Sequence, residues 1–557
     1  MENLPQELID RISSHLDVVQ LKQTLMVNQK FQAAAERYSG AFDEVSIDEK
    51  TAQKFFDTFS SHRFRYLRRI KFATTLPAPQ CDPDAGRPPC RESQEDLKAL
   101  DEDFTRQIRL LFDVISKLEA RVQSYSPGNV QLTIYTPFMD VDPNLFCRHR
   151  AFVSWRVHLL APQHLPILGS IRALRVVNGT SFSPFKEPWR TLRKLDLRVL
   201  VDIANKLPNL GALACEIGGD EWPTPLTDET TANFWRVYQG PRRDTRHDFA
   251  SAVENISMPP LREVLLNFIC PNDHNERIDQ RVAMPDLVAP ARYDPFSSSL
   301  RTLSYSLRRM CIFAVVDSTL FLPRDGSTPS WPYLESVNVR FHMASPSGTW
   351  YFKGLQDGGR IGGYKLQDES AYPPLEKTLQ DEEEDEEEDY VDWQGWAHAQ
   401  FRVMPDDDVL GPFLAAFAKS TQYMPSLKEA ALWCPLKFSV EDMGGLYEDY
   451  DSSEVKQDDV QAMAWGIAYT APGQKAFSEH PGVDKAACRQ LWWKVGKCRP
   501  NPRVCELVRQ VGRQQHGDDL IEHWEDEYYG DGLVDRDIFE AFEWRVFPDF
   551  NLDLFYY

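Results

Sequence analysis

The chain has 557 residues and a mass of 64.2 kDa, more than one compact core usually holds, so we expect several domains or an elongated repeat structure. Hydrophobic residues make up 42% of it and charged residues 26%, a composition that excludes an intrinsically disordered protein. The formal net charge of -22 argues against a nucleic-acid partner, and the apolar runs are too short to span a membrane.

The ten cysteines stand singly along the chain, without a C-x-x-C pair. Isolated cysteines are typical of reduced thiols in an intracellular protein. A basic segment followed by an apolar one, as in a secretion signal, is missing from the first residues. We therefore expect a soluble protein of the cytosol or the nucleus.

Residues 4–16, LPQELIDRISSHL, predict an amphipathic helix whose apolar side chains occupy an arc of roughly 140°. Pro5 lies in the first turn, where a helix needs no N–H donor, and Glu7 complements the positive end of the helix dipole. The residues up to about Phe42 predict one or two further short helices. So small a unit builds little core alone, and its apolar side must pack on the rest of the chain or on another protein.

The same residues resemble the F-box family, in the pattern L-P-x-E-L-I-x-x-I-x-x-x-L-D at 4–17, then Leu21, then V-N-Q-K-F at 27–31. The resemblance implies a three-helix unit that binds a Skp-family adaptor and, through it, a cullin-RING ubiquitin ligase. It also implies the residues that contact the adaptor or shape the contact face: Leu4, Pro5, Leu8, Ile9, Ile12, Leu16, Leu25, Val27 and Phe31. The alternative is an ordinary helical hairpin packed on its own protein.

Beyond Val45, eight segments share the form apolar-x-x-apolar-x-apolar, which is typical of the strand of a leucine-rich repeat. They are residues 66–72, 171–177, 192–198, 207–215, 261–268, 300–306, 334–341 and 427–434. Their spacing is irregular, so insertions must loop out between repeats. We predict an α+β or α/β chain, in which a three-helix F-box is followed by an irregular leucine-rich-repeat-like solenoid. Unrelated buried strands in an α/β domain are the alternative.

These patterns divide the chain into an F-box at 1–45, the repeat-like domain at 46–470 and a capping segment at 471–557. Helical spacing predicts helices at 95–125 and 411–424, which we expect on the outer side of the strands. Residues 74–93 predict an exposed loop, and residues 359–392 a mobile insertion that carries the acidic run Asp381–Asp389. The combination resembles the F-box proteins of filamentous fungi, a similarity of architecture that transfers no substrate.

Motifs for phosphate binding, nucleophilic catalysis and zinc are missing from the sequence. Cys498, Cys505, His516 and His523 come nearest to a metal cluster, but their spacing departs from zinc templates, and core thiols with surface histidines are the simpler interpretation. We therefore predict no catalytic residue, no cofactor and no metal.

The sequence and the resemblance together predict a non-catalytic substrate receptor, whose first 45 residues bind the adaptor and whose body binds an unidentified target protein. Holding a target near the conjugating enzyme raises its effective concentration without a reacting group in the receptor. Two alternatives stay open: a scaffold that binds the adaptor outside ubiquitination, and an enzyme whose site is assembled from distant residues.

Overall fold

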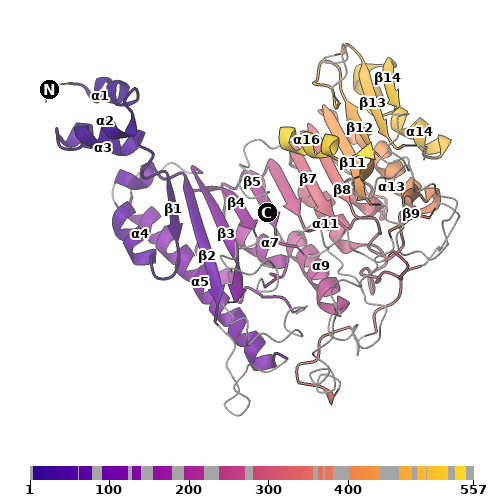
Figure 1. The fold of residues 1–557 in the computed structure, drawn as a ribbon, viewed down its shortest axis with the longest axis horizontal. Helices are drawn as coiled ribbons and strands as arrows, with labels where there is room; N and C mark the ends of the chain where they lie inside the picture. Colours follow the sequence, from indigo (N-terminus) through magenta and orange to yellow (C-terminus); the bar gives the residue numbers. More distant parts are fainter. Residues whose placement is uncertain are drawn as a thin grey trace, which may run out of the picture.

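A single large sheet organises the computed structural model of this chain (Figure 1). The structure describes residues 4–60, 62–77, 91–122, 128–139, 155–177, 193–218, 238–256, 258–269, 280–354, 362–367, 371–379, 400–437, 463–478, 486–496, 499–524 and 534–546. Twelve strands follow one another across the sheet in the order β1-β2-β3-β4-β5-β6-β7-β8-β11-β12-β13-β14, and β15 pairs with β12. Two short strands, β9 and β10, form a separate antiparallel pair.

The strands are short and most are buried. Their bounds are β1 Glu44–Ile47, β2 Arg69–Leu76, β3 Val130–Met139, β4 Ile171–Val177, β5 Ala212–Glu216, β6 Glu263–Asn267, β7 Arg309–Ala314, β8 Ser336–Phe341, β9 Phe352–Lys353, β10 Met404–Pro405, β11 Glu429–Leu436, β12 Met463–Thr470, β13 Arg489–Lys494, β14 Leu520–Trp524 and β15 Val534–Asp535. Every neighbouring pair from β1 to β11 is parallel, whereas β12 is antiparallel to both β11 and β13.

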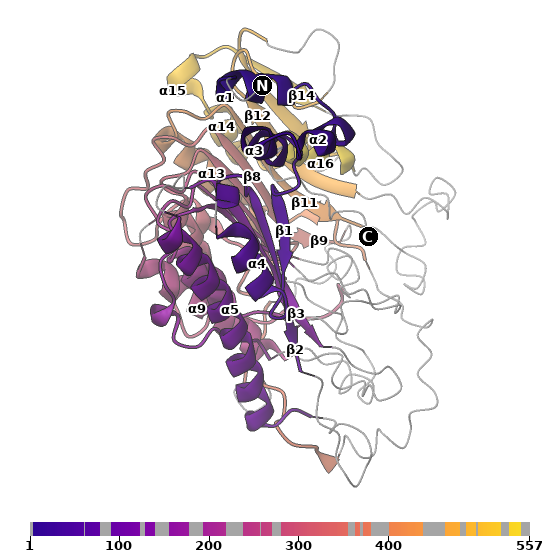
Figure 2. The same ribbon diagram turned by 90° about the vertical axis from the view of Figure 1, so that its left-hand side faces the viewer.

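Parallel neighbours need long crossover connections, which the helices of the body supply on one face of the sheet (Figure 2). These helices are α4 Ala52–Phe59, α5 Gln94–Arg121, α7 Arg198–Ala204, α9 Gln239–Glu254, α11 Pro295–Ser304 and α13 Asp407–Ser420, with the 3-10 turns η1 His62–Arg65, η3 Pro162–His164, η5 Ser318–Leu320 and η8 Thr421–Tyr423. Helices α14 Pro502–Arg509 and α15 Arg513–His516 precede β14. None of the described helices is long and apolar enough to cross a membrane.

The main hydrophobic core lies between the sheet and these helices. In β8, Val337, Val339 and Phe341 join that core. Because side chains alternate along a strand, Asn338 and Arg340 face the other side of the sheet. In β8, the face toward the helices is therefore apolar, whereas the opposite face carries polar and charged side chains.

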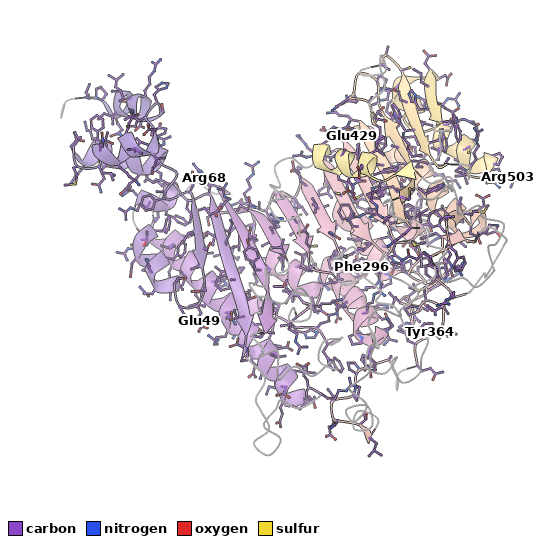
Figure 3. The ribbon with its side chains drawn as sticks, viewed as in Figure 1. Glu49, Arg68, Phe296, Tyr364, Glu429 and Arg503 are labelled. Carbon is purple, nitrogen blue, oxygen red and sulfur yellow. The ribbon has the colours of Figure 1, made fainter. Side chains whose placement is uncertain are left out.

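Helix α16 (Asp537–Val546) covers this second face over the carboxyl-terminal half of the sheet. Phe539 stacks on Trp433 of β11 with ring centroids 5.1 Å apart. Arg545 donates a hydrogen bond of 2.7 Å to Glu429, which lies beside the helix in Figure 3. The last described helix thus closes a second, smaller core on the sheet.

The predicted fold, a three-helix F-box followed by an irregular leucine-rich-repeat-like solenoid, is wrong. The chain has an α/β fold around one mostly parallel sheet, which is the alternative that the sequence left open. Three short helices do open the chain, but the described residues show neither a separate F-box domain nor a solenoid. The physical reason is that the pattern apolar-x-x-apolar-x-apolar marks any buried parallel strand and does not specify how its connections are built.

Six of the eight patterned segments contain a strand, namely β2, β4, β5, β6, β8 and β11. The segment 192–198 instead leads into α7, with one isolated bridge from Leu195 to Val157. The segment 300–306 lies mostly in α11, because Asp294 caps that helix and Pro295 occupies its first turn. The predicted helices at 95–125 and 411–424 are confirmed as α5 and α13.

Several predictions concern residues outside the described ranges. The acidic run Asp381–Asp389 and Cys498 are among them, as are the greater parts of segments 74–93 and 359–392. In the predicted capping segment, β13 and β14 continue the sheet past residue 470.

Candidate docking surface

The amino-terminal helices carry a concentration of exposed apolar side chains. These helices are α1 Gln6–Ser13, α2 Val18–Thr24 and α3 Gln29–Tyr38. Seven of the fifteen exposed large hydrophobic residues in the described part of the chain lie within residues 8–27. We call them the amino-terminal patch: Leu8, Ile12, Val18, Val19, Leu25, Met26 and Val27.

The two helices after α1 each begin at a residue whose side chain caps the helix. Asp17 accepts a hydrogen bond of 2.8 Å from the Gln20 amide, while Gln20 accepts one from the Asp17 amide. Asn28 accepts a hydrogen bond of 2.9 Å from the Phe31 amide at the start of α3. Helices this short are marginal in isolation, so their stability depends on packing.

Packing inside the amino-terminal unit uses few residues. Ile9, Phe31 and Ala34 form a buried cluster of their own, with Leu4 and Tyr38 packed against it. This cluster is separate from the core under the sheet. The patch residues belong to neither core, so they stay exposed in the described structure.

Glu36 of α3 joins this unit to the body. Its buried carboxylate accepts hydrogen bonds from Arg63 (2.6 Å, Nη2 to Oε1) and from His62 (2.8 Å). Burial alone would raise the pKa of Glu36, but the bonds from Arg63 and His62 outweigh burial and lower it. Tyr66 adds a hydrogen bond from its hydroxyl to the Ala33 carbonyl, and these contacts orient the helices relative to β2.

The residues predicted from the resemblance divide into three groups. Ile9 and Phe31 are buried and shape the unit from within. Leu4 and Leu16 are half-buried. The exposed group comprises Pro5, Leu8, Ile12, Leu25 and Val27.

Three exposed apolar residues, Val18, Val19 and Met26, were not predicted from the sequence. Met26 is the most exposed large hydrophobic residue of the described chain, at 93%. The signal was available, because two adjacent valines directly after a helix-capping aspartate cannot both face the inside of a short helix.

Of the four residues that came nearest to a metal cluster, Cys498 lies outside the described ranges. Within the ranges that the structure describes, no group of three His, Cys, Asp or Glu side chains could hold a metal ion. His523 stacks on Trp492, with centroids 3.8 Å apart, and its Nε2 lies 2.9 Å from Oε1 of Gln490. Cys505 is buried in α14, and His516 is exposed.

No family model matches this chain, and no curated protein matches it. The residues themselves, and above all the amino-terminal patch, are therefore what indicates a function.

Proposed function

We propose that this chain is a substrate-receptor subunit of an SCF-type cullin-RING ubiquitin ligase. A Skp-family adaptor binds the amino-terminal patch, and the α/β body binds a target protein. The observation that carries the proposal is the concentration of exposed apolar side chains within residues 8–27, in the segment whose pattern resembles the F-box family.

The energetics of burial support a protein partner. Covering a Leu, Ile, Val or Met side chain fully is worth about 1.5–3 kcal/mol, although association costs consume part of that gain. A few well-packed anchors carry most interfaces, so the seven exposed apolar residues within residues 8–27 are enough in number for a specific one. The unbranched side chain of Met26 can adapt to an irregular partner surface.

The receptor supplies proximity and no reacting group. With the adaptor on α1 and α2 and the target on the body, the target's lysines would lie within reach of the conjugating enzyme. Five cysteines of the described chain take part in no disulfide bond, which agrees with a cytosolic or nuclear location, where thiols stay reduced.

The test is co-purification with a Skp-family adaptor. The triple variant Leu8→Ala, Ile12→Ala and Val27→Ala removes exposed apolar surface without touching the cluster around Ile9 and Phe31. We expect adaptor recovery to fall at least tenfold while the circular dichroism spectrum stays unchanged.

A matched control removes the same kind of surface elsewhere. Ile167, Leu379 and Ile521 are also exposed apolar residues, and their combined change to alanine should leave adaptor recovery intact. Equal recovery by the patch variant and the control would contradict the proposal. If the adaptor binds but proteasome inhibition does not raise the captured partners, the chain is an adaptor-bound scaffold and not a ubiquitin-ligase receptor.

A further inference from the structure

A pocket with both apolar and charged lining residues lies where the chain leaves three parallel strands of the central sheet. Ile269 follows β6, His342 follows β8 and Lys437 follows β11, and all three line it. In open α/β sheets, ligands bind at the carboxyl ends of the strands. Strands β8 and β11 lie toward the end of the sheet away from the amino-terminal helices (Figure 1), so this pocket is distinct from the docking surface.

Three cationic side chains contribute to the wall of the pocket, namely Arg340, Lys437 and Arg536. Among the residues that the structure describes, no carboxylate lines it. Glu216 and Glu543 lie close enough to Arg340 to interact with its charge. Loss of hydration raises the pKa of each of these two carboxyls to about 7, so at neutral pH they offset the arginine only in part.

Two side chains of the wall have polar atoms that the described structure does not satisfy. Arg340 is 6% exposed, and its guanidinium carbon lies 3.8 Å from the ring centroid of Phe313, but its Nε has no hydrogen-bond partner among the described residues. Gln400 is 3% exposed, and its Oε1 likewise has none there. Leaving a buried polar atom unpaired costs about 1–3 kcal/mol, so native proteins usually satisfy it with water or a ligand.

The rest of the wall is fixed by its own hydrogen bonds. Gln280 Oε1 accepts from the amides of Phe401 (2.7 Å) and Arg402 (2.6 Å), and the Gln280 carbonyl accepts from Arg402 Nε (2.9 Å). His342 Nδ1 accepts from the Ala344 amide, and burial lowers the pKa of His342 well below its usual range. The ring is therefore neutral and carries its proton on Nε2, so it adds a donor to the wall and no charge.

The size of the pocket restricts the ligand. The space open to the centres of water-sized molecules is about 30 Å³. One water needs roughly 10–15 Å³ on this measure, so the pocket takes about two such atoms. The two oxygens of a carboxylate match that space if the rest of the acid extends toward solvent, whereas the four oxygens of a phosphate exceed it.

We infer that this pocket binds the carboxylate group of a small organic acid, paired with the guanidinium of Arg340 and attracted by Lys437 and Arg536. Arginine suits this role because its planar N–H groups match the two oxygens of a carboxylate. Gln400 Oε1 would accept a hydrogen bond from a hydroxyl or amino group beside that carboxylate.

The test uses the full-length protein and acetate as the probe, with sodium chloride keeping the ionic strength constant. We expect acetate to raise the melting temperature saturably and to bind one-to-one by calorimetry, and inorganic phosphate to bind more weakly. Arg340→Gln should weaken acetate binding at least tenfold. No binding beyond that of chloride would overturn the inference, and phosphate binding more tightly than acetate would overturn the carboxylate assignment.

A second variant covers the case in which Arg340→Gln fails to fold, because Arg340 also offsets Glu216 and Glu543. Lys437 is half-buried at the end of β11, so Lys437→Gln should fold and weaken acetate binding about threefold to tenfold. The matched control is Lys419→Gln, an exposed lysine of α13 outside the pocket, which should bind acetate like the unmodified protein. Equal affinities of the Lys437→Gln and Lys419→Gln proteins would contradict the inference. Loss of acetate binding with intact adaptor recovery would leave the proposed function unaffected.

Discussion

Arg246 of α9 and Asp294 at the start of α11 form an ion pair of 2.9 Å in which neither side chain is exposed. Asp294 Oδ2 also accepts a hydrogen bond of 3.0 Å from the Ser297 amide, and Arg246 donates one of 3.0 Å to the Val315 carbonyl. The pair therefore joins two helices to the segment that follows β7, inside the layer that covers the sheet.

Removing one partner of this pair should be strongly destabilising. Asp294→Ala leaves the charge of Arg246 buried without its carboxylate and removes the cap of α11. Because removing one partner of a buried ion pair costs about 3–5 kcal/mol, we expect the free energy of unfolding to fall by about that amount. Urea denaturation measures it, with Asp57→Ala on the exposed side of α4 as a control that should change it by less than about 0.5 kcal/mol. A similar loss in both variants would contradict this role of the pair.

Asp317 should make stability depend on pH in the opposite sense to a carboxylate whose pKa is lowered by folding, such as Glu36. Burial, and next the charge of Asp294, raise its pKa to about 6 from an ordinary value of 3.8. The folded state therefore holds this proton more tightly than the unfolded state, so the penalty for ionising Asp317 disappears as the pH falls from about 6 to about 4.

In the variant Asp317→Asn, the amide side chain does not ionise between pH 4 and pH 7. Its stability relative to the unmodified protein should rise between pH 4 and pH 7, by on the order of 2–3 kcal/mol, and then level off. Urea unfolding of both proteins across that range measures the difference. Asp325→Asn is the control, because Asp325 is exposed and its pKa is lowered by hydrogen bonds from Ser327. A difference that stays constant with pH would contradict the assignment.

Glu36 should control how firmly the amino-terminal helices are held on the body. Glu36→Gln keeps an acceptor for Arg63 but removes the charge, so we expect faster amide hydrogen exchange across α1 to α3 and unchanged exchange in β4 to β8. Since the folded pKa is lowered, the charged contribution is full above about pH 4.5 and is lost as the pH falls below it.

The matched control for that experiment is Glu44→Gln. Glu44 also pairs with two cations, Arg69 and Lys71, but it lies in β1 and not in the amino-terminal helices. Protection of α1 to α3 should survive this change. If both variants loosen the three helices equally, Glu36 does not have the anchoring role described here.

Gly466 of β12 should be intolerant of any side chain. A Cβ there would lie 2.6 Å from both Phe539 of α16 and Trp433 of β11. Gly466→Ala must therefore displace both α16 and the neighbouring strand β11, whose Leu432 carbonyl oxygen would lie 2.7 Å from the Cβ. Overpacking of this kind costs about 1–3 kcal/mol. Gly362→Ala, where a Cβ meets nothing within 4 Å, is the control for thermal denaturation. Equal melting temperatures of the two variants would contradict this prediction, since they would show that the added methyl group is accommodated without loss of stability.

Local patterns were enough to predict much of the secondary structure. The alternation in β4 and β8 and the helical spacing of α5 are properties of neighbouring residues, so they are legible in the sequence. β7 was missed because the pattern was assigned to residues 300–306, which the cap at Asp294 turns into α11. The amphipathic start of the chain was equally legible, although the outward side of α2 was overlooked.

By itself, the sequence determined where apolar stripes and helix caps occur, including the stripe that becomes the amino-terminal patch. Only the tertiary structure decided that the strands from β1 to β8 pair in chain order within one sheet, because strand pairing depends on contacts between residues far apart. The same holds for the pocket, whose Gln280, Arg340, Lys437 and Arg536 come from distant parts of the chain and meet only in the folded structure. A site built from residues so far apart in the chain has no local sequence pattern that could predict it.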